Sequence, residues 1–546
     1  MRSFFAELKR RNVFGAMAFY LAAGWLLVQV ATQVLPFYDV PGWVVRLVIA
    51  AVVIGFPFAL VLSWFYEWTP RGWRREIEND RSESKKFVGS IATDQSIAVL
   101  PFVDMSEDQD QEYFSDGLSE ELLNLLAQLP QLRVIARTSS FSFKGKAADV
   151  ATIARALNVA TVLEGSVRKS GNTLRITAQL IRAVDSSHLW SQTYDRELVD
   201  VFQVQDGIAN AVVAALKVKL LSSQQVTNAH RTGNTEAYDQ YLLGQNVFRR
   251  GRYDDYQRAL VAFERATALD PGYGAAQAAL ASAQSAVADF APGAAARSAG
   301  KLEALATAER AITLAPDLAD GYVIRGRLRM AQFWDWNGAE ADFQKALALE
   351  PNKSDVLIMH ALVLNNLQRT DEAVATLRRA IDADPLSWLA WMLWGAVLGR
   401  LGCADEGRVG FERALEISPD SSFTRHEFGC LELVQGRTKE ALAHFRLAGA
   451  AFSQSGIAMA EYTLGHERES QAALAELESK YATGFLFQIA QVHAWRGDKD
   501  AAFEWLERAC AERDTGIARI RGDLLLDRIK DDPRYTALVR KIGFPQ

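Results

Sequence analysis

Cysteine is scarce in this chain, whose 546 residues include only Cys403, Cys430 and Cys510. So few cysteines cannot build a disulfide framework, and no Cys-x-x-Cys pair is present to begin a structural zinc module. Net charge is also small, at −6 from 60 basic and 66 acidic side chains. An acidic balance gives no bulk attraction to nucleic acid, so no nucleic-acid partner is predicted.

Catalytic and cofactor motifs are missing as well. The sequence has no GxxxxGK[ST] phosphate loop, no HExxH and no GxSxG. The acid/base candidates of note are Asp116, Glu120, Glu121 and His188. Asp116 is expected to be a helix N-cap, and the two glutamates are expected to lie in a solvated first turn. We therefore predict no catalytic residue, no metal site and no cofactor, and the chain is not expected to be an enzyme.

Charged residues are absent from two N-terminal runs, 13–35 and 47–66, which are 23 and 20 residues long. At a rise of about 1.5 Å per residue, each run can cross a hydrocarbon layer of about 30 Å. A cleaved signal peptide is the alternative for the first run, but its apolar region would be shorter, at roughly 7–15 residues. We expect residues 1–70 to form two transmembrane helices, at about 13–35 and 44–66.

Basic residues flank both uncharged runs, which predicts that both termini and the soluble domains are cytoplasmic at a bacterial inner membrane. The flanking residues are Lys9, Arg10, Arg11, Arg71, Arg74 and Arg75. The lipid bilayer is thus an expected partner. Small residues recur every four positions at Ala51, Gly55 and Ala59, and such stripes let helices approach closely. Packing within the hairpin is the favoured interpretation, and a homodimer is the alternative.

A charged, serine-rich linker at 71–93 precedes a segment, 94–222, with the pattern of a small α/β domain. A buried strand is expected at 97–102, followed by a helix with leucines on one face. Two alternating strands, Thr161–Arg168 and Thr173–Ile181, form a hairpin with one wet face. The predicted order is βαβαβββα, a mixed-sheet domain.

This segment resembles the TolB amino-terminal-like and FlgO-like domains of bacteria. The stretches that carry the resemblance are SIAVLPF (96–102), FSDGLSEEL (114–122), RVIARTSSFSFKG (133–145), VLEGSVRKSGNTLRITAQLI (162–181) and HLWSQTYDRE (188–197). The resemblance implies a binding or structural module fused to varied partners. TolB itself is periplasmic, whereas this domain is expected in the cytoplasm, so a role in the Tol system does not follow.

A repeat of 34 residues begins after a short linker at 223–234. Pro351, Pro385 and Pro419 are each 34 residues apart, and small and aromatic residues precede them at matching offsets. This pattern resembles the tetratricopeptide (TPR) family, in which two helices cross at small residues and a proline ends the second helix. We expect seven or eight repeats over 235–515 and a C-terminal cap at 516–546.

Stacked TPR helices form a superhelix whose concave groove is built from the first helix of each pair. The repeat register places nine candidate binding residues in this groove: Asn365, Asn366, Met392, Arg400, Phe423, His426, Phe487, Gln491 and Trp495. We expect them to bind a protein or peptide partner. The alternative is that they solvate the groove or pack between repeats.

The expected fold class is therefore multi-domain: a two-helix transmembrane hairpin, a small mixed-sheet α/β domain and an all-α TPR superhelix. The leading functional hypothesis is a non-catalytic adaptor anchored in the inner membrane. In related architectures, TolB-like and TPR segments follow an adenylate cyclase, kinase or CadC-like domain. The alternative is thus a signalling receptor or regulator, with a small ligand bound by the α/β domain.

Overall fold

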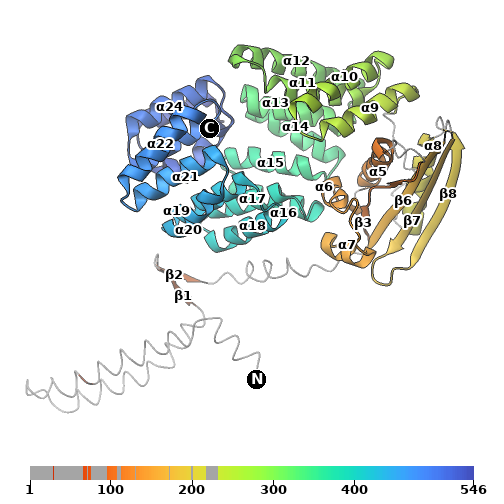
Figure 1. Ribbon diagram of the computed structural model, residues 1–546, viewed down its shortest axis with the longest axis horizontal. Helices are drawn as coiled ribbons and strands as arrows, with labels where there is room; N and C mark the ends of the chain where they lie inside the picture. The colour runs from red at the N-terminus through yellow and green to blue at the C-terminus, as the bar shows by residue number, and fades with distance from the viewer. Residues whose placement is uncertain are drawn as a thin grey trace, which may run out of the picture. The chain divides into compact units, whose positions relative to one another are not determined.

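The structure, a computed structural model, describes most of the chain beyond the N-terminal segment. The described residues are Gln29, 66–69, 72–75, 95–106, 112–129, 131–170, 173–197, 201–216 and 231–545. They belong to two compact units, Met1–Ser90 and Ile91–Gln546 (Figure 1). In the first unit, β1 (Tyr66–Thr69) pairs with β2 (Gly72–Arg75) as an antiparallel hairpin.

The transmembrane hairpin in the expected fold class was wrong. Within the described residues, no helix has both the length and the apolar character that a membrane crossing requires. The longest, α12 (Gly293–Leu314), has 22 residues but carries charged side chains such as Arg297, Lys301 and Glu303. The expected spans at 13–35 and 44–66 lie outside the described residues, apart from Gln29 and Tyr66. The fold class supported is a mixed-sheet α/β domain followed by a helical superhelix.

The α/β domain is built on one six-stranded sheet, with strand order β5-β3-β6-β7-β8 and β4 paired to β6. Its strands are β3 (Ser96–Val99), β4 (Val103–Asp104), β5 (Arg133–Val134), β6 (Thr161–Ser170), β7 (Thr173–Arg182) and β8 (His188–Glu197). Its helices are α5 (Glu112–Ala127), α6 (Arg137–Phe141), α7 (Val150–Leu157) and α8 (Val201–Ala215). β3 runs parallel to β5 and β6, whereas β6, β7 and β8 are antiparallel, so the predicted mixed sheet is confirmed.

Alternation along β7 explains why one face of this sheet is covered. Leu174 and Ile176 are buried, whereas Arg175 between them points to solvent and pairs with Asp195 at 2.6 Å.

Asp116 does not cap a helix as expected, because α5 begins one turn earlier. Its carboxylate instead accepts hydrogen bonds from Lys144 Nζ at 2.7 Å.

Eight antiparallel helix pairs follow in the described residues from 235 onward. They are α9 (Thr235–Phe248) with α10 (Tyr253–Leu269), α11 (Gly274–Ala288) with α12 (Gly293–Leu314), α13 (Ala319–Leu328) with α14 (Trp336–Leu349), α15 (Ser354–Asn366) with α16 (Thr370–Ala383), α17 (Trp388–Arg400) with α18 (Ala404–Ile417), α19 (Ser422–Val434) with α20 (Thr438–Leu447), α21 (Ala450–Thr463) with α22 (Glu467–Tyr481), and α23 (Leu486–Arg496) with α24 (Lys499–Ala511). A short π-helix, η3 (Arg329–Phe333), continues α13.

The repeat period is visible in the packing of these pairs. Phe343 and Phe411 lie at the same repeat position, and both are almost completely buried. Close helix crossing depends on small residues. A Cβ atom added at Gly395 in α17 would lie 2.6 Å from the carbonyl oxygen of Gly407 in α18. These contacts produce the superhelix that the 34-residue spacing predicted.

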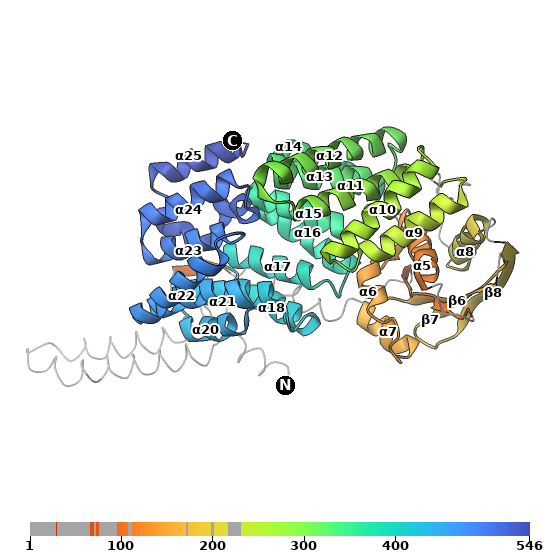
Figure 2. The same ribbon diagram turned by 45° about the horizontal axis from the view of Figure 1, so that its top comes forward.

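The α/β domain and the first repeat share one hydrophobic core within the second unit. A Cβ atom added at Gly117 in α5 would lie 2.7 Å from Leu242 in α9, so these helices are in close contact. Tyr113 also donates a hydrogen bond to Asp239 at 2.7 Å. Figure 2 shows α5 beside α9. The sheet domain is therefore packed on the repeat array as one continuous body.

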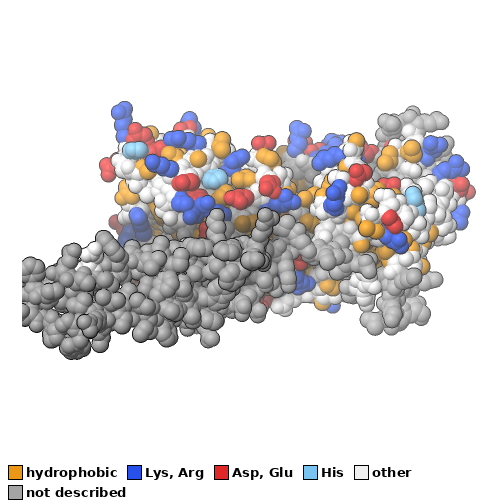
Figure 3. Space-filling view, turned by 90° about the horizontal axis from the view of Figure 1, so that it is seen from below, with side chains coloured by type: hydrophobic (Ala, Val, Ile, Leu, Met, Phe, Trp, Pro, Cys, Tyr) orange, Lys and Arg blue, Asp and Glu red, His pale blue; other side chains and the backbone are white. Residues whose placement is uncertain are grey.

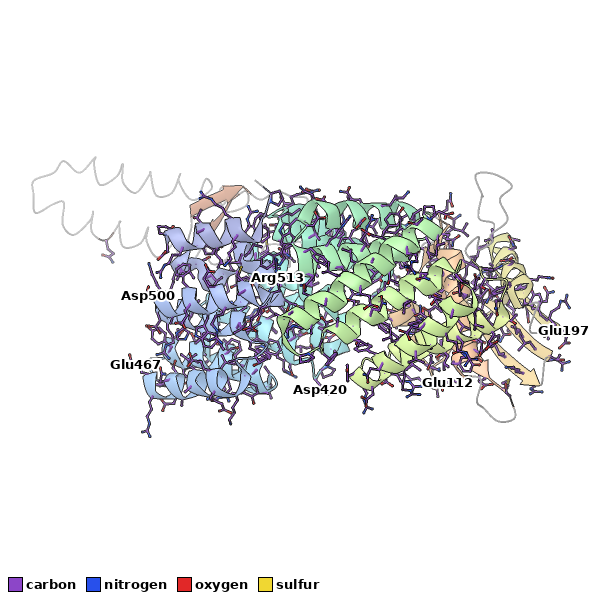
Figure 4. All side chains as sticks on the ribbon, turned by 90° about the horizontal axis from the view of Figure 1, so that it is seen from above. Glu112, Glu197, Asp420, Glu467, Asp500 and Arg513 are labelled. Atoms are coloured by element: carbon purple, nitrogen blue, oxygen red, sulfur yellow. The ribbon has the colours of Figure 1, made fainter. Side chains whose placement is uncertain are left out.

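The last segment of the chain folds back toward the middle of the array. It comprises two 3₁₀ segments, η4 (Thr515–Gly522) and η5 (Leu524–Ile529), and then α25 (Pro533–Ile542). The ring of Phe544 stacks on Trp336 at 4.7 Å, and Trp336 Nε1 donates to the carbonyl oxygen of Ile542 at 3.3 Å. Arg513, labelled in Figure 4, places its guanidinium 3.6 Å from the ring centre of Trp334. The C-terminal segment thus closes the array onto α14.

Candidate functional site

The groove-lining first helices contain all nine candidate binding residues. Asn365 and Asn366 end α15, Met392 and Arg400 belong to α17, Phe423 and His426 to α19, and Phe487, Gln491 and Trp495 to α23. The space that these helices enclose is filled by the chain itself, because η4 lies against α15 and η5 lies against α19 and α23. We call residues 514–529 the returning segment.

Arg519 anchors the returning segment to α19. Its Nη1 lies 2.9 Å from Glu427 Oε1, and its guanidinium carbon lies 5.9 and 5.8 Å from the ring centres of Phe423 and Phe487. Burial acts to raise the pKa of Glu427, but the charge of Arg519 and the neighbouring His426 ring together outweigh it and leave that pKa below its usual value. The pair is therefore ionised on both sides at neutral pH.

Asp523 makes the second polar anchor. Gln491 Nε2 donates to Asp523 Oδ2 at 2.7 Å, and the backbone N–H of Leu525 donates to Asp523 Oδ1 at 2.9 Å. Burial raises the pKa of Asp523, and the positive charges of Arg519 and Arg400 oppose this rise. The cavity that remains beside Arg400 and Gln491 is about 50 Å³, large enough for water but not for a peptide.

The two ends of the returning segment are fixed by α23. The backbone N–H of Phe487 donates to Asp514 Oδ2 at 3.4 Å. Arg528 donates to the carbonyl oxygen of Trp495 and places its guanidinium 5.0 Å from the ring centre of that tryptophan. Five of the nine candidate residues thus lie against residues 514–529: Arg400, Phe423, Phe487, Gln491 and Trp495.

The other four candidate residues are buried in the groove wall. His426 is 1% exposed and its Nε2 lies 3.0 Å from Ser455 Oγ, while Met392 is also 1% exposed. Asn365 and Asn366 are 5% and 6% exposed, and Asn366 Oδ1 has no hydrogen-bond partner among the described residues. These side chains present little surface to a partner from outside.

Three residues that decide the polarity of the groove escaped the sequence reasoning: Glu427, Arg519 and Asp523. Glu427 directly follows a candidate residue, but a helical glutamate ordinarily reads as a solvated side chain. Arg519 and Asp523 lie four residues apart in a stretch assigned to a terminal cap. Their opposite charges at this short spacing were the available signal, although nothing in the repeat register shows where this segment docks.

A second polar contact joins the α/β domain to the array. Ser139 in α6 donates to Asp384 Oδ1, and the backbone N–H of Ala136 donates to the carbonyl oxygen of Ala383 at 2.8 Å. Burial raises the pKa of Asp384 to about 6, although the hydrogen bond from Ser139 opposes this rise. The turn between α16 and α17 is therefore linked to the sheet domain.

The two parts of the second unit match two different protein families. Residues 93–211 match the family described as the HilA/YgeH-like transcriptional regulator, second domain, in place of the TolB-like or FlgO-like domain that we expected. The stretches that suggested TolB lie largely on strands and buried helix faces, which reflect fold more than family. Residues 354–385, which span α15 and α16, match the tetratricopeptide repeat. This helix pair is therefore a tetratricopeptide repeat, as the 34-residue spacing predicted.

Two curated bacterial proteins resemble parts of the TPR-containing chain. "Putative adenylate cyclase 3" of Rhizobium meliloti (strain 1021) is 38% identical over 216 residues, which cover 39% of this chain and 36% of that protein. Protein FlbA of Caulobacter vibrioides is 34% identical over 83 residues, which cover 15% of this chain and 14% of FlbA. The chain therefore spans about a third or less of the length of these relatives.

Solved structures with a remote likeness include the TPR protein YrrB and a human IFIT1 dimer. YrrB is 20% identical, with 39% of this chain and 97% of that chain covered at a TM-score of 0.28. IFIT1 is 16% identical, with 57% of this chain and 77% of that chain covered at a TM-score of 0.37.

Proposed function

We propose that this chain is a non-catalytic scaffold whose TPR array binds a protein or peptide partner. The observation that supports the proposal is the returning segment, because it is a polypeptide seated in a TPR groove. Arg519 of this segment donates to Glu427 of the groove, and Gln491 of the groove donates to Asp523 of the segment at 2.7 Å. The array thus already holds one polypeptide through paired polar groups and aromatic rings.

The setting that we propose for the scaffold is signalling or transcriptional regulation. The likeness of residues 93–211 to a domain of transcriptional regulators favours this setting. So does the relative named as an adenylate cyclase, which is 38% identical over 216 residues. The second candidate function is accordingly a regulator in which the α/β domain binds a small ligand and the TPR array responds.

Surface charge agrees with a protein partner. On the face drawn in Figure 3, Lys and Arg side chains of the described residues are interspersed with Asp and Glu. A mixed surface of this kind suits selective polar contacts with a protein.

The location predicted from the sequence also remains a proposal: the bacterial inner membrane, with the soluble domains in the cytoplasm. The described residues do not test it, and neither the bilayer contact nor a homodimer has support from them. A reporter fused to the C-terminus tests the cytoplasmic side. Activity of a reporter that functions only in the periplasm would contradict this location.

Two measurements on the full chain test the scaffold role. Purified protein incubated with ATP and Mg²⁺ is expected to form no cyclic AMP, and steady formation would overturn the non-catalytic assignment.

In cells, a photo-crosslinking amino acid is placed in turn on exposed positions of each repeat. A protein adduct from one repeat, absent from its neighbours, supports the scaffold. Absence of adducts from every repeat would contradict it.

A further inference from the structure

A second groove of about 520 Å³ lies on the array, away from the returning segment. It is formed by α10, α11 and α12, which lie together in the first two repeats (Figure 2). Glu264 comes from α10, Gln277 and Gln284 come from α11, and Glu303 and Arg310 come from α12. We call this space the outer groove.

Two glutamines give the outer groove unused hydrogen-bond acceptors. Gln277 is 4% exposed, and its Oε1 has no partner among the described residues. The Oε1 of Gln284 is likewise buried without a partner in this part of the structure, while its Nε2 donates to Glu303 at 3.0 Å. A buried acceptor without a donor is costly, so these two carbonyl groups point to a donor supplied from outside the fold.

The repeat register shows which residue types these two positions accept. Two later repeats, aligned through Pro271, Pro351 and Pro385, replace Gln277 by Leu357 and Trp391. The same alignment replaces Gln284 by Leu364 and Leu398, and these four apolar side chains are at most 7% exposed. Apolar residues can therefore fill these positions, although the repeats aligned through Pro316 and Pro419 carry Arg329 and Glu432 at the position of Gln284.

The ligand that fits this lining is rich in donors and positively charged. Two carboxylates, on Glu264 and Glu303, and two amide oxygens face one guanidinium, on Arg310. Gln277 and Gln284 lie seven residues apart on one helix, which is about 10 Å along its axis. Backbone N–H groups three residues apart in a polyproline-II segment have a similar spacing, of roughly 9 Å, and they point to the same side because this helix has three residues per turn.

We infer that the outer groove binds an extended peptide segment that carries lysine or arginine. Its cationic side chain lies between Glu264 and Glu303, and its backbone N–H groups donate to Gln277 and Gln284 after these two amides turn from their buried positions toward the groove. This assignment rests on the proposed scaffold function, for which it names the class of partner. It also places partner binding on a surface that the returning segment leaves open.

Fluorescence anisotropy with the full chain tests the inference. The probe is a labelled nonapeptide of alanine and proline with three interspersed lysines, which favours the polyproline-II conformation, and its counterpart has glutamates in place of the lysines. We expect the basic peptide to bind and Glu264→Lys to weaken binding by about tenfold or more, since a charged hydrogen-bond partner is lost and repulsion is added. The matched control is Glu412→Lys, because Glu412 follows the buried Phe411 as Glu264 follows Phe263. The control should bind like the unmodified chain.

A second variant separates the acceptors from the charge. Gln277→Leu should weaken peptide binding severalfold while circular dichroism and the melting temperature stay unchanged. The assignment would be overturned if the acidic peptide bound as tightly as the basic one, or if Glu264→Lys and Glu412→Lys lost the same affinity. Displacement of the basic peptide by equimolar spermidine would also overturn it. A cellular adduct that maps to another repeat would also overturn it, and in that case the scaffold role itself would stand.

Discussion

The two grooves of the TPR array differ in what occupies them. In the inner groove, Glu427 and Asp523 find their partners within the chain, on Arg519 and Gln491. In the outer groove, the acceptor of Gln277 finds none among the described residues. One repeat fold thus supports both a self-filled interior and an open surface. The difference lies in whether a later segment of the chain supplies the complementary groups.

This comparison implies opposite responses to substitution. Residues of the inner groove behave as core residues, so their replacement should change stability. Residues of the outer groove should change binding and leave stability alone. Four predictions test this difference between the grooves, and the largest expected change in stability comes first.

The largest effect is expected at Leu526 of the returning segment, which is completely buried against the last repeat. Leu526→Ala removes buried apolar volume and leaves a cavity, which should reduce the free energy of unfolding by about 2–5 kcal/mol. Urea denaturation of the full chain measures this loss. Leu447→Ala is the control, because Leu447 is 65% exposed and should change stability by no more than about 0.5 kcal/mol. Similar small losses for both variants would mean that the returning segment does not fill the groove in solution.

The second effect concerns the ion pair between Arg519 and Glu427. Glu427→Gln leaves the Arg519 guanidinium without its counter-charge, and we expect a loss of about 2–4 kcal/mol, since removal of one partner strands a buried charge. Both side chains keep some exposure, 18% and 14%, so the lower half of this range is favoured.

A double-mutant cycle isolates this pair. Arg519→Met should also destabilise the chain alone, but the double variant should lose clearly less than the sum of the two single losses. Additive losses would show that the two side chains do not interact and would separate the returning segment from α19.

The sequence predicted the packing that recurs in every repeat, and it did not predict the contacts that occur only once. The offsets that lead to Pro351, Pro385 and Pro419 predicted the superhelix, because each helix pair must bury the same small and aromatic positions against its neighbours. The mixed sheet followed from the predicted order of strands and helices, and its solvent-facing side followed from alternation in β7. The docking of Arg519 depends on one long-range contact that no period encodes, so a segment assigned to a cap turned out to fill the groove.

The third prediction compares the inner groove with the contact between α6 and the array. Burial raises the pKa of Asp384 to about 6 from its usual 3.8, so the folded chain binds this proton more tightly than the unfolded chain. The stabilisation is present at low pH and is lost as pH rises through about 6, by no more than about 3 kcal/mol. The pair of Arg519 and Glu427 keeps its charges over that range.

Unfolding of the unmodified chain and of Asp384→Asn at about pH 5 and pH 7 measures this contribution. The unmodified chain should gain stability relative to Asp384→Asn at the lower pH. An identical pH dependence in the two proteins would show that Asp384 titrates as an exposed carboxyl group and does not hold the sheet domain to the array.

The smallest effect is the sharpest comparison, because it makes the same substitution in both grooves. Gln491→Leu removes the donor to Asp523 and leaves that carboxylate short of a buried partner, which should cost about 1–3 kcal/mol. Gln277→Leu removes an acceptor that has no donor in the described structure and supplies the residue type found at Leu357, so its cost should be near zero. The urea midpoints of the two variants measure these losses of stability. Equal destabilisation would mean that Gln277 is satisfied inside the fold, and the outer groove would then be a structural feature like the inner one.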